Sequence, residues 1–372
     1  MKITKLETFH VKPRWLFLKV HTDAGIVGLG EPVVEGRAQT VETAVREIAR
    51  WLIGQDPRRI EHIWQCIHRG TFYRGGPILS SALSGVEQAL WDILGKYLQV
   101  PVHQLLGGAV RDRIRMYGWI QTEQGEHYID SVKRSLLQKS FTAYKIGPIG
   151  PSRFTETPAE IDRIVAKVAA VRQAAGNAID IAVDFHGRAS PAMARQLARL
   201  LEPYRPMFIE EPVLPGDTLA LKELSRTTVI PIATGERLTT RWQFQELIET
   251  EAVAILQPDL SHAGGIFEVR KIAAMAESRN MAIAPHCPLG PIALAASLQL
   301  DACTPNFLCQ EHVTLGDDYL TKPFQVADGY IDVPTAPGLG IELDDDKLRA
   351  GLFQGDWQTP IWTLEDGSFA EW

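Results

Sequence analysis

The sequence of 372 residues is poor in cysteine and has no long apolar run. Its four cysteines form no C-x-x-C pair and no regular spacing, which argues against a disulfide framework and predicts reduced thiols. No run reaches the roughly 18 apolar residues that a membrane span needs, and residues 1–15 contain no apolar signal core. We therefore expect a cytoplasmic protein without a membrane partner.

Basic blocks and several common catalytic motifs are also missing. The net charge is −7 at pH 7, so we expect no nucleic-acid partner. The absence of G-x-G-x-x-G and G-x-x-x-x-G-K-S/T disfavours dinucleotide and nucleotide sites. The absence of G-x-S-x-G and H-E-x-x-H disfavours serine hydrolases and zinc proteases. With 45% hydrophobic and 22% charged residues, the chain is globular rather than fibrous or disordered.

From about residue 113 onward, short apolar segments alternate with amphipathic ones. The strand-like segments begin 23 to 38 residues apart, which fits one strand, one helix and two loops per unit. They are IRMYGWI from Ile114, AYKIG from Ala143, IAVDF from Ile181, MFIEE from Met207, PIATGE from Pro231, AILQPD from Ala254, MAIAPH from Met281 and FLCQE from Phe307. Eight such units predict a closed (β/α)7β TIM-like barrel over residues 113–320, rather than an open doubly wound sheet.

The two ends of the chain have a different pattern. Residues 1–112 contain three strand-like stretches with glycines at the turns, followed by helical stretches from Val41 and Ser80. We predict a separate α+β domain there. Residues 321–372 contain no further βα unit, so we expect this C-terminal segment to pack back on the N-terminal domain.

The carboxyl ends of the predicted barrel strands carry acidic residues. In a parallel αβ-barrel the active site forms at these ends. Asp184, Glu210 and Glu236 follow one another at a spacing of 26 residues, which places three carboxylates side by side. Single acidic residues at such positions often only cap helices, but three at equivalent positions favour a hard cation, Mg²⁺ or alternatively Mn²⁺. We expect Glu211, which neighbours Glu210, to face the helix layer or a charged partner.

Histidines follow two of the same strands. Asp259 and His286 are one βα unit apart, so the carboxylate can orient the imidazole of a general base. Alternation along a strand puts His186 on the same face as Asp184, within reach of a substrate. Taken singly, each histidine is as often structural as catalytic.

Four other residues deserve mention, and the roles of the first three are open. Lys145 ends the second strand and either binds a substrate carboxylate, acts in acid–base chemistry or is merely solvated. Tyr73 and Arg74, in the glycine-containing loop FYRGGPIL, could reach a ligand from the N-terminal domain. Cys287 is adjacent to His286 and is expected to pack rather than to act as a nucleophile.

These residues resemble the mandelate racemase branch of the enolase superfamily. The segment ALSGVEQALWDILGKYLQVPVHQLLGG, residues 82–108, is similar to a helix signature of that branch. The resemblance implies that the N-terminal domain caps the barrel and that Asp184, Glu210 and Glu236 bind one Mg²⁺. It further implies that Asp259 and His286 form the family's dyad, that Glu311 hydrogen-bonds the intermediate, and that the chain forms homo-oligomers.

Within that branch the sequence is most similar to the galactonate dehydratases. The matching segments are PRWLFLKV, FYRGGPIL, DFHGR, FIEEPV, QPDLSHAGG, APHCPLGPIALAA and AEW. The resemblance implies that His286 removes the C2 proton of D-galactonate and that His186 helps the C3 hydroxyl to leave, which gives a 2-keto-3-deoxy acid. AYKIG offers Lys145 without the Lys-x-Lys pair of racemases, and one base with one acid suits elimination.

Two loops depart from the galactonate dehydratase pattern, at residues 147–160 and 313–338. Both follow barrel strands, so a related aldonate such as gluconate or a pentonate remains an alternative substrate. An epimerase or racemase of the same superfamily is a second alternative. A non-catalytic metal-binding scaffold is a third.

Overall fold

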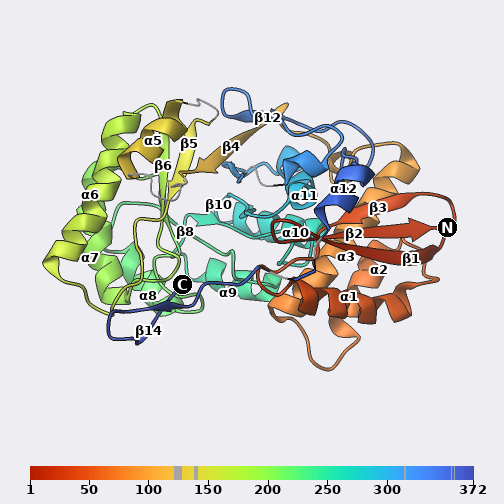
Figure 1. Ribbon diagram of the computed structural model, residues 1–372, viewed down its shortest axis with the longest axis horizontal. Helices are drawn as coiled ribbons and strands as arrows, with labels where there is room; N and C mark the ends of the chain where they lie inside the picture. Colours follow the sequence, from red (N-terminus) through yellow and green to blue (C-terminus); the bar gives the residue numbers. More distant parts are fainter. Residues whose placement is uncertain (121–127, 138–140, 314–315, 353, 356) are drawn as a thin grey trace.

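The computed structural model describes residues 1–120, 128–137, 141–313, 316–352, 354–355 and 357–372. Figure 1 shows a small antiparallel sheet with its helices at one end of the molecule and a larger group of strands and helices at the other. Among the described residues, no helix has the length and apolar character needed to cross a bilayer.

Eight parallel strands form the barrel in the order of the chain. They are β4 (Arg113–Trp119), β5 (Ala143–Ile146), β6 (Asp180–Asp184), β7 (Phe208–Glu210), β8 (Ile232–Thr234), β9 (Ile255–Leu256), β10 (Ala282–Ile283) and β11 (Gln310–Glu311). The last strand pairs in parallel with β4, and a bridge between Ile283 and Phe307 joins it to β10. All eight predicted segments contain or adjoin a strand, which confirms the (β/α)7β prediction.

Helices connect the strands and cover the barrel. They are α5 (Tyr128–Leu137), α6 (Pro158–Ala175), α7 (Pro191–Leu201) with η1 (Glu202–Tyr204), α8 (Thr218–Ser225), α9 (Arg241–Glu249), α10 (Ile266–Glu277) and α11 (Pro291–Cys303). Several begin where a side chain caps them: Thr157, Ser190 and Thr240 each accept a backbone N–H of the first turn. These caps determine the residue at which each loop ends and its helix begins.

The barrel interior is filled by one residue from each strand or its immediate flank. Two large rings, Tyr117 and Phe208, meet edge to face at 6.3 Å. The whole cluster consists of Tyr117, Ala143, Ala182, Phe208, Ala233, Ile255, Ala284 and Cys309. A packed interior closes the barrel below the carboxyl ends of the strands, so any site lies at the mouth.

The N-terminal domain is an α+β unit, as predicted. Its strands β1 (Ile3–Val11), β2 (Trp15–Thr22) and β3 (Val27–Gly30) form an antiparallel sheet in chain order. The helices are α1 (Ala38–Leu52), α2 (Ile60–Arg69), α3 (Gly76–Leu98) and α4 (Val102–Leu105). The sequence patterns did not indicate α2.

Helix α3 packs so closely on β3 that no side chain fits between them. A Cβ on Gly30 would lie 1.9 Å from the carbonyl oxygen of Gly85, and a helix backbone cannot move aside as a side chain does. We expect Gly30→Ala to lower the free energy of unfolding by about 3 kcal/mol, measured by urea denaturation. Gly150→Ala is the control, since nothing lies within 4 Å of its added Cβ. Equal stability of the two variants would contradict this packing.

Buried carboxylates of the N-terminal domain bind the first turns of two barrel helices. Glu31 accepts the backbone N–H groups of Gly290 (2.7 Å) and Ala293 (2.9 Å) at the start of α11. Glu87, on α3, accepts those of Ile266 (2.7 Å) and Phe267 (2.9 Å) at the start of α10. Because the first N–H groups of a helix have no partner within the helix, these carboxylates fasten the N-terminal domain to the barrel.

The C-terminal segment contains η2 (Asp317–Tyr319), β12 (Tyr330–Asp332), α12 (Asp345–Gly351), β13 (Trp362–Thr363) and β14 (Phe369–Ala370). Strand β12 pairs with β4. Lys19 on β2 lies 2.5 Å from Asp345, and the Lys12 N–H donates to Gly351. Beyond residue 357 the segment also contacts barrel loops. The division at residues 112 and 320 stays a prediction.

Candidate active site

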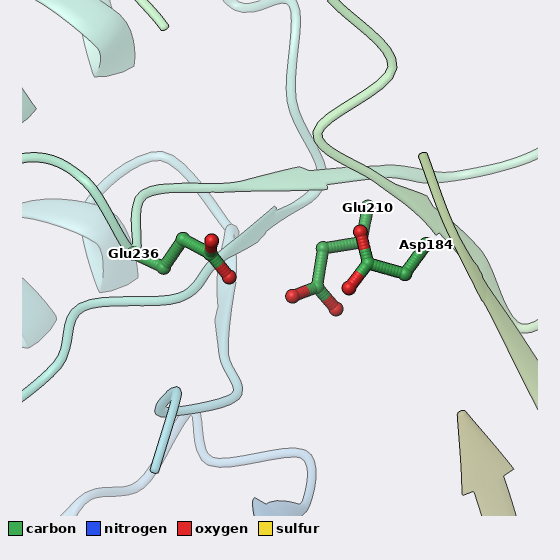
Figure 2. Close-up of side chains that lie close together, drawn as sticks. All are labelled: Asp184, Glu210 and Glu236. Atoms are coloured by element: carbon green, nitrogen blue, oxygen red, sulfur yellow. The ribbon is translucent and has the colours of Figure 1, made fainter. Parts of the chain in front are cut away.

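Three carboxylates converge at the barrel mouth (Figure 2). Asp184 and Glu210 end β6 and β7 and are register partners, while Glu236 comes two residues after β8. One oxygen of each carboxylate lies within 4.8 Å of the others. The equal spacing in the sequence therefore corresponds to a real cluster on adjacent strands.

One oxygen of each carboxylate in this cluster lacks a hydrogen-bond donor among the described residues. Asp184 Oδ2, Glu210 Oε2 and Glu236 Oε2 are all buried without a hydrogen-bond partner among the described residues. Burial and Asp184 raise the pKa of Glu210 well above its usual range, although Lys145 opposes this. Burial and Glu211 raise the pKa of Glu236 to about 8, although His286 opposes this. Three carboxylate oxygens without hydrogen-bond partners in one small space fit a divalent cation with oxygen ligands.

Lys145 lies completely buried at the centre of the site. Its Nζ is 2.7 Å from Glu210, 2.8 Å from Glu311 and 3.5 Å from Asp184. Burial lowers the pKa of Lys145, but the negative charges of Glu210 and Glu311 together raise it by more than burial lowers it. The pKa of Lys145 therefore lies well above its usual range. One ammonium group cannot balance all the carboxylates that meet here, which leaves room for additional positive charge.

Glu311, on the eighth strand, is an acceptor with each oxygen occupied. Its Oε1 accepts hydrogen bonds from Lys145 and from Trp119 Nε1 (2.5 Å), and its Oε2 accepts the Cys287 N–H (2.9 Å). Burial opposes ionisation, but Lys145 and His286 lower the pKa of Glu311 to about 2. An ionised carboxylate only accepts hydrogen bonds, and both oxygens of Glu311 already accept them from the protein. Hydrogen bonding of Glu311 to an intermediate stays a prediction.

His286 and Asp259 lie together as the sequence predicted. Beyond β9 and β10 they occupy facing positions of a parallel bridge, and His286 Nδ1 lies 2.9 Å from Asp259 Oδ2. The other ring nitrogen, Nε2, is 3.2 Å from Glu236 and 3.9 Å from Glu311. Burial lowers the pKa of His286, but Glu236 and Glu311 raise it, and its pKa lies well above the usual range. The Asp259 contact orients Nε2 toward the carboxylate cluster.

The N-terminal domain supports this dyad from behind. The Ser261 N–H donates to Asp259 Oδ1 (2.7 Å), and Gln88 of α3 donates to Ser261 Oγ (3.0 Å). Ser81, also on α3, lies 2.8 Å from His262 Nδ1, whose other nitrogen is 3.7 Å from Asp259 Oδ2. Helix α3 therefore fixes the loop that carries Asp259.

His186 also lies at the cluster, but its position does not result from the strand alternation that we assumed. Strand β6 ends at Asp184, and His186 has a left-handed backbone with φ of 51°. Its N–H donates to Asp184 Oδ1 (2.8 Å), and its Nε2 lies 3.2 Å from Asp184 Oδ2. Burial lowers the pKa of His186 to about 4, although Asp184 opposes this. The imidazole is therefore neutral at pH 7 in this structure.

Two expected non-ligands lie as predicted. Glu211 turns away from the cluster and binds Arg237, with distances of 2.5 and 3.0 Å. The Cys287 side chain is buried, and burial raises the pKa of its thiol well above the usual range. Neither side chain contributes an oxygen or a thiolate to the cluster.

The structure does not bring Tyr73 and Arg74 to the site. Tyr73 is 82% exposed, and its ring contacts the neighbouring ring of Phe72 at 5.3 Å. Arg74 is exposed as well. Both residues border a cavity of about 670 Å³ between α1, α2 and α3, away from the strand ends. Substrate binding by these two residues stays a prediction.

Sequence reasoning missed two tryptophans beside His186. The Trp119 ring stacks on the imidazole at 5.9 Å and 15°, and the Trp372 ring lies at 6.3 Å and 43°. Trp119 ends the first barrel strand, so the strand-end rule that found the acidic residues could have found it. No spacing rule points to Trp372.

The two divergent loops lie partly beside the site. In the first, residues 147–160, Ile149 O accepts a hydrogen bond from Arg188 (2.8 Å) and Phe154 O accepts one from Ser190 (2.5 Å). The second, 313–338, includes residues 314–315, which lie outside the described residues. The first loop is therefore held against the chain that follows His186.

Comparisons with known proteins agree with this geometry. The mandelate racemase / muconate lactonizing enzyme N-terminal domain matches residues 4–107, and the enolase C-terminal domain-like family matches residues 127–347. D-galactonate dehydratases of Ralstonia nicotianae and Cronobacter sakazakii are each 49% identical over 100% of both chains. A solved enolase of Agrobacterium radiobacter, proposed to be a galactarate dehydratase, has a TM-score of 0.92 at 29% identity over 100% of both chains, with bound Na and L-malate.

Proposed function

The chain belongs to the mandelate racemase and muconate lactonizing enzyme family of the enolase superfamily, and on that premise we propose that it dehydrates D-galactonate. The product is a 2-keto-3-deoxy acid. Full-length identity of 49% to two D-galactonate dehydratases supports this substrate. The observation that carries the reaction type is the meeting of two histidines with three carboxylates at one barrel mouth, each carboxylate with one oxygen that has no hydrogen-bond partner among the described residues.

We assign the carboxylates of Asp184, Glu210 and Glu236 to a single Mg²⁺. Their unpartnered oxygens are hard ligands, and among the residues that the structure describes no cysteine or histidine joins them in the cluster. Bound there, the ion supplies positive charge that stabilises the negative charge developing on the substrate carboxylate when the C2 proton leaves. We further propose a cytoplasmic homo-oligomer.

His286 is the residue that we assign to proton removal at C2. Asp259 holds Nδ1, so Nε2 is the nitrogen that faces the carboxylate cluster. Burial lowers the pKa of His286, but Glu236 and Glu311 raise it well above its usual range, so the assignment requires a cation on the cluster to offset their charge and free Nε2 of its proton. The ring thus approaches a substrate whose carboxylate lies at the cluster, on the side of β10. Proton transfer to Nε2 leaves an imidazolium that Asp259 stabilises.

His186 is the residue that we assign to proton donation at C3. The C3–O bond breaks, the hydroxyl leaves with a proton from His186 as water, and the electron pair released at C2 forms the C2–C3 double bond. An acid must carry the proton that it gives, and burial lowers the pKa of His186 to about 4. The assignment therefore requires the anionic substrate to raise this pKa on binding.

The surroundings of Lys145 disfavour racemisation. A racemase needs a second base that is free to take a proton on the face opposite His286. Lys145 is instead fully buried and bound to Glu210 at 2.7 Å and Glu311 at 2.8 Å, with a pKa well above the usual range. A group that holds its proton so firmly is not a base at neutral pH.

A metal-dependent screen tests the proposed function. We expect the purified protein with Mg²⁺ to form a 2-keto acid from D-galactonate faster than from other C4 to C6 sugar acids. Removal of divalent ions by a chelator should abolish product formation, and excess Mg²⁺ should restore it, because the ion stabilises the negative charge that develops on the substrate carboxylate. The readout is a colorimetric assay of the 2-keto acid.

Each other outcome of the screen has a definite meaning. Turnover of gluconate or a pentonate alone would retain the chemistry and assign the loop at residues 147–160 to specificity. Exchange of the C2 proton without elimination would favour an epimerase. Full activity in the chelated protein would contradict the metal assignment.

A further inference from the structure

The two histidines at the barrel mouth are held in different ways. His286 has a hydrogen-bond partner at Nδ1, so the rotation of its ring is fixed by Asp259. His186 Nδ1 is buried and has no hydrogen-bond partner among the residues that the structure describes. Nε2 of the same ring lies 3.2 Å from Asp184 Oδ2.

The backbone of His186 is nevertheless firmly placed. Its N–H donates to Asp184 and its carbonyl oxygen accepts a hydrogen bond from Arg237 (3.2 Å). The next residue, Gly187, donates its N–H to the Glu211 carbonyl oxygen (2.8 Å). These bonds leave the side-chain torsions of His186 free, so ring orientation must come from the packing of its neighbours.

Those neighbours are two tryptophans from distant parts of the sequence. Trp119 ends β4 and is itself anchored, because its Nε1 donates to Glu311 (2.5 Å). Trp372 comes from the segment 357–372, which we call the strap. Aromatic rings pack best in offset or tilted arrangements at such centroid distances of about 4.5 to 7 Å.

The strap reaches His186 by crossing between the N-terminal domain and the barrel loops. In Figure 1 the dark blue chain passes from α12, near the three-stranded sheet, to β14, near α8, before it ends. Near its start, Trp357 packs under the guanidinium of Arg14 at 5.0 Å and against Trp372 at 6.3 Å. Further along, Trp362 packs under Arg188 at 4.3 Å, two residues beyond His186.

The attachment of the strap to the N-terminal domain is close. Arg14, in the turn between β1 and β2, also binds Glu35 at 3.0 Å and donates to Pro288 O at 3.3 Å. A Cβ on Gly36 would lie 2.5 Å from Thr359 Oγ1, so the strap fits against the bare backbone there. Contacts at both ends therefore determine where Trp372 lies.

We propose that Trp372 is a positioning residue that, with Trp119, holds the His186 imidazole in the orientation needed to protonate the leaving C3 hydroxyl. The proposal rests on the dehydratase function proposed above. Trp372 contacts the rings of His186 and Trp357, and within the described part of the chain it makes no ring contact with His286. Its loss should therefore affect the acid step without affecting proton removal at C2.

The test compares elimination with C2 exchange in the full-length protein. The rate of D-galactonate dehydration is measured as the rate of 2-keto acid formation. The rate of exchange is measured in D₂O as the incorporation of deuterium at C2 of recovered substrate. We expect Trp372→Ala to lower kcat for dehydration about 100-fold, since small misplacements of a reacting group cost this much. Exchange should stay within about threefold of the wild type. Trp372→Phe should restore most of the dehydration rate, because a ring again packs on His186.

Two further variants separate positioning from general damage. Trp51→Ala removes a tryptophan of matched exposure, 40% against 39%, on α1, and should change neither rate. Trp357→Ala removes the neighbour of Trp372 in the strap and should reproduce the selective loss in part. Parallel loss of exchange and dehydration in Trp372→Ala, or no loss of either, would overturn the proposal. A wild-type protein that performs neither reaction would refute the proposed function and this inference with it.

Discussion

Alanine in place of His286 is expected to lower the rate of deuterium exchange at C2 of D-galactonate by about 10⁴-fold, the upper range for loss of a general base. The reason is geometric. Asp259 holds His286 Nδ1 at 2.9 Å, so Nε2 is the nitrogen that faces the carboxylate cluster. Dehydration should be lost to the same extent, because elimination follows removal of this proton. The exchange is measured by NMR of recovered substrate.

The control for this variant is His62→Ala, which removes an exposed histidine from α2. It should exchange and dehydrate at the wild-type rate. Thermal melting of His286→Ala should show a folded protein, since the residue lies at the mouth and outside the packed interior. Unchanged exchange in a folded His286→Ala protein would show that another group is the base.

The second large effect is expected from His186→Ala. Dehydration should fall by about 10²- to 10⁴-fold, the usual contribution of a general acid. Exchange at C2 should continue, because His286 and Asp259 are intact and the proton returns when the hydroxyl cannot leave. The two rates are measured in one D₂O incubation, so their ratio does not depend on the protein concentration.

His186→Asn provides the comparison within the same position. Asparagine keeps a polar side chain that can contact Asp184 but has no proton of suitable acidity to transfer. We expect it to behave like the alanine variant in dehydration and in exchange. Loss of both reactions in both variants would show that His186 serves binding or proton removal rather than departure of the hydroxyl.

The barrel and its acidic cluster were predictable because they follow from periodicity. Each βα unit returns the chain to the same end of the barrel, so residues one unit apart meet, as Asp184, Glu210 and Glu236 do. The same rule brought Asp259 to His286. The periodicity fixes the end of each strand, and acidic or imidazole residues within three positions of that end lie at the barrel mouth.

Other features of the site depend on contacts that no periodicity describes. His186 follows the end of β6 in a left-handed conformation, so strand alternation does not place its ring. Lys145 is buried between carboxylates of β7 and β11, which lie far away in the sequence. Trp372 reaches the site through a chain segment without any barrel repeat. Such positions are set by tertiary packing alone.

The carboxylates of Glu31 and Glu87 have a consequence for how a substrate gains access. Separating the two domains would strip four backbone N–H groups, at the starts of α10 and α11, of their buried acceptors. A hinge between the domains is therefore costly to open. A substrate therefore has to reach the barrel mouth without the two domains separating.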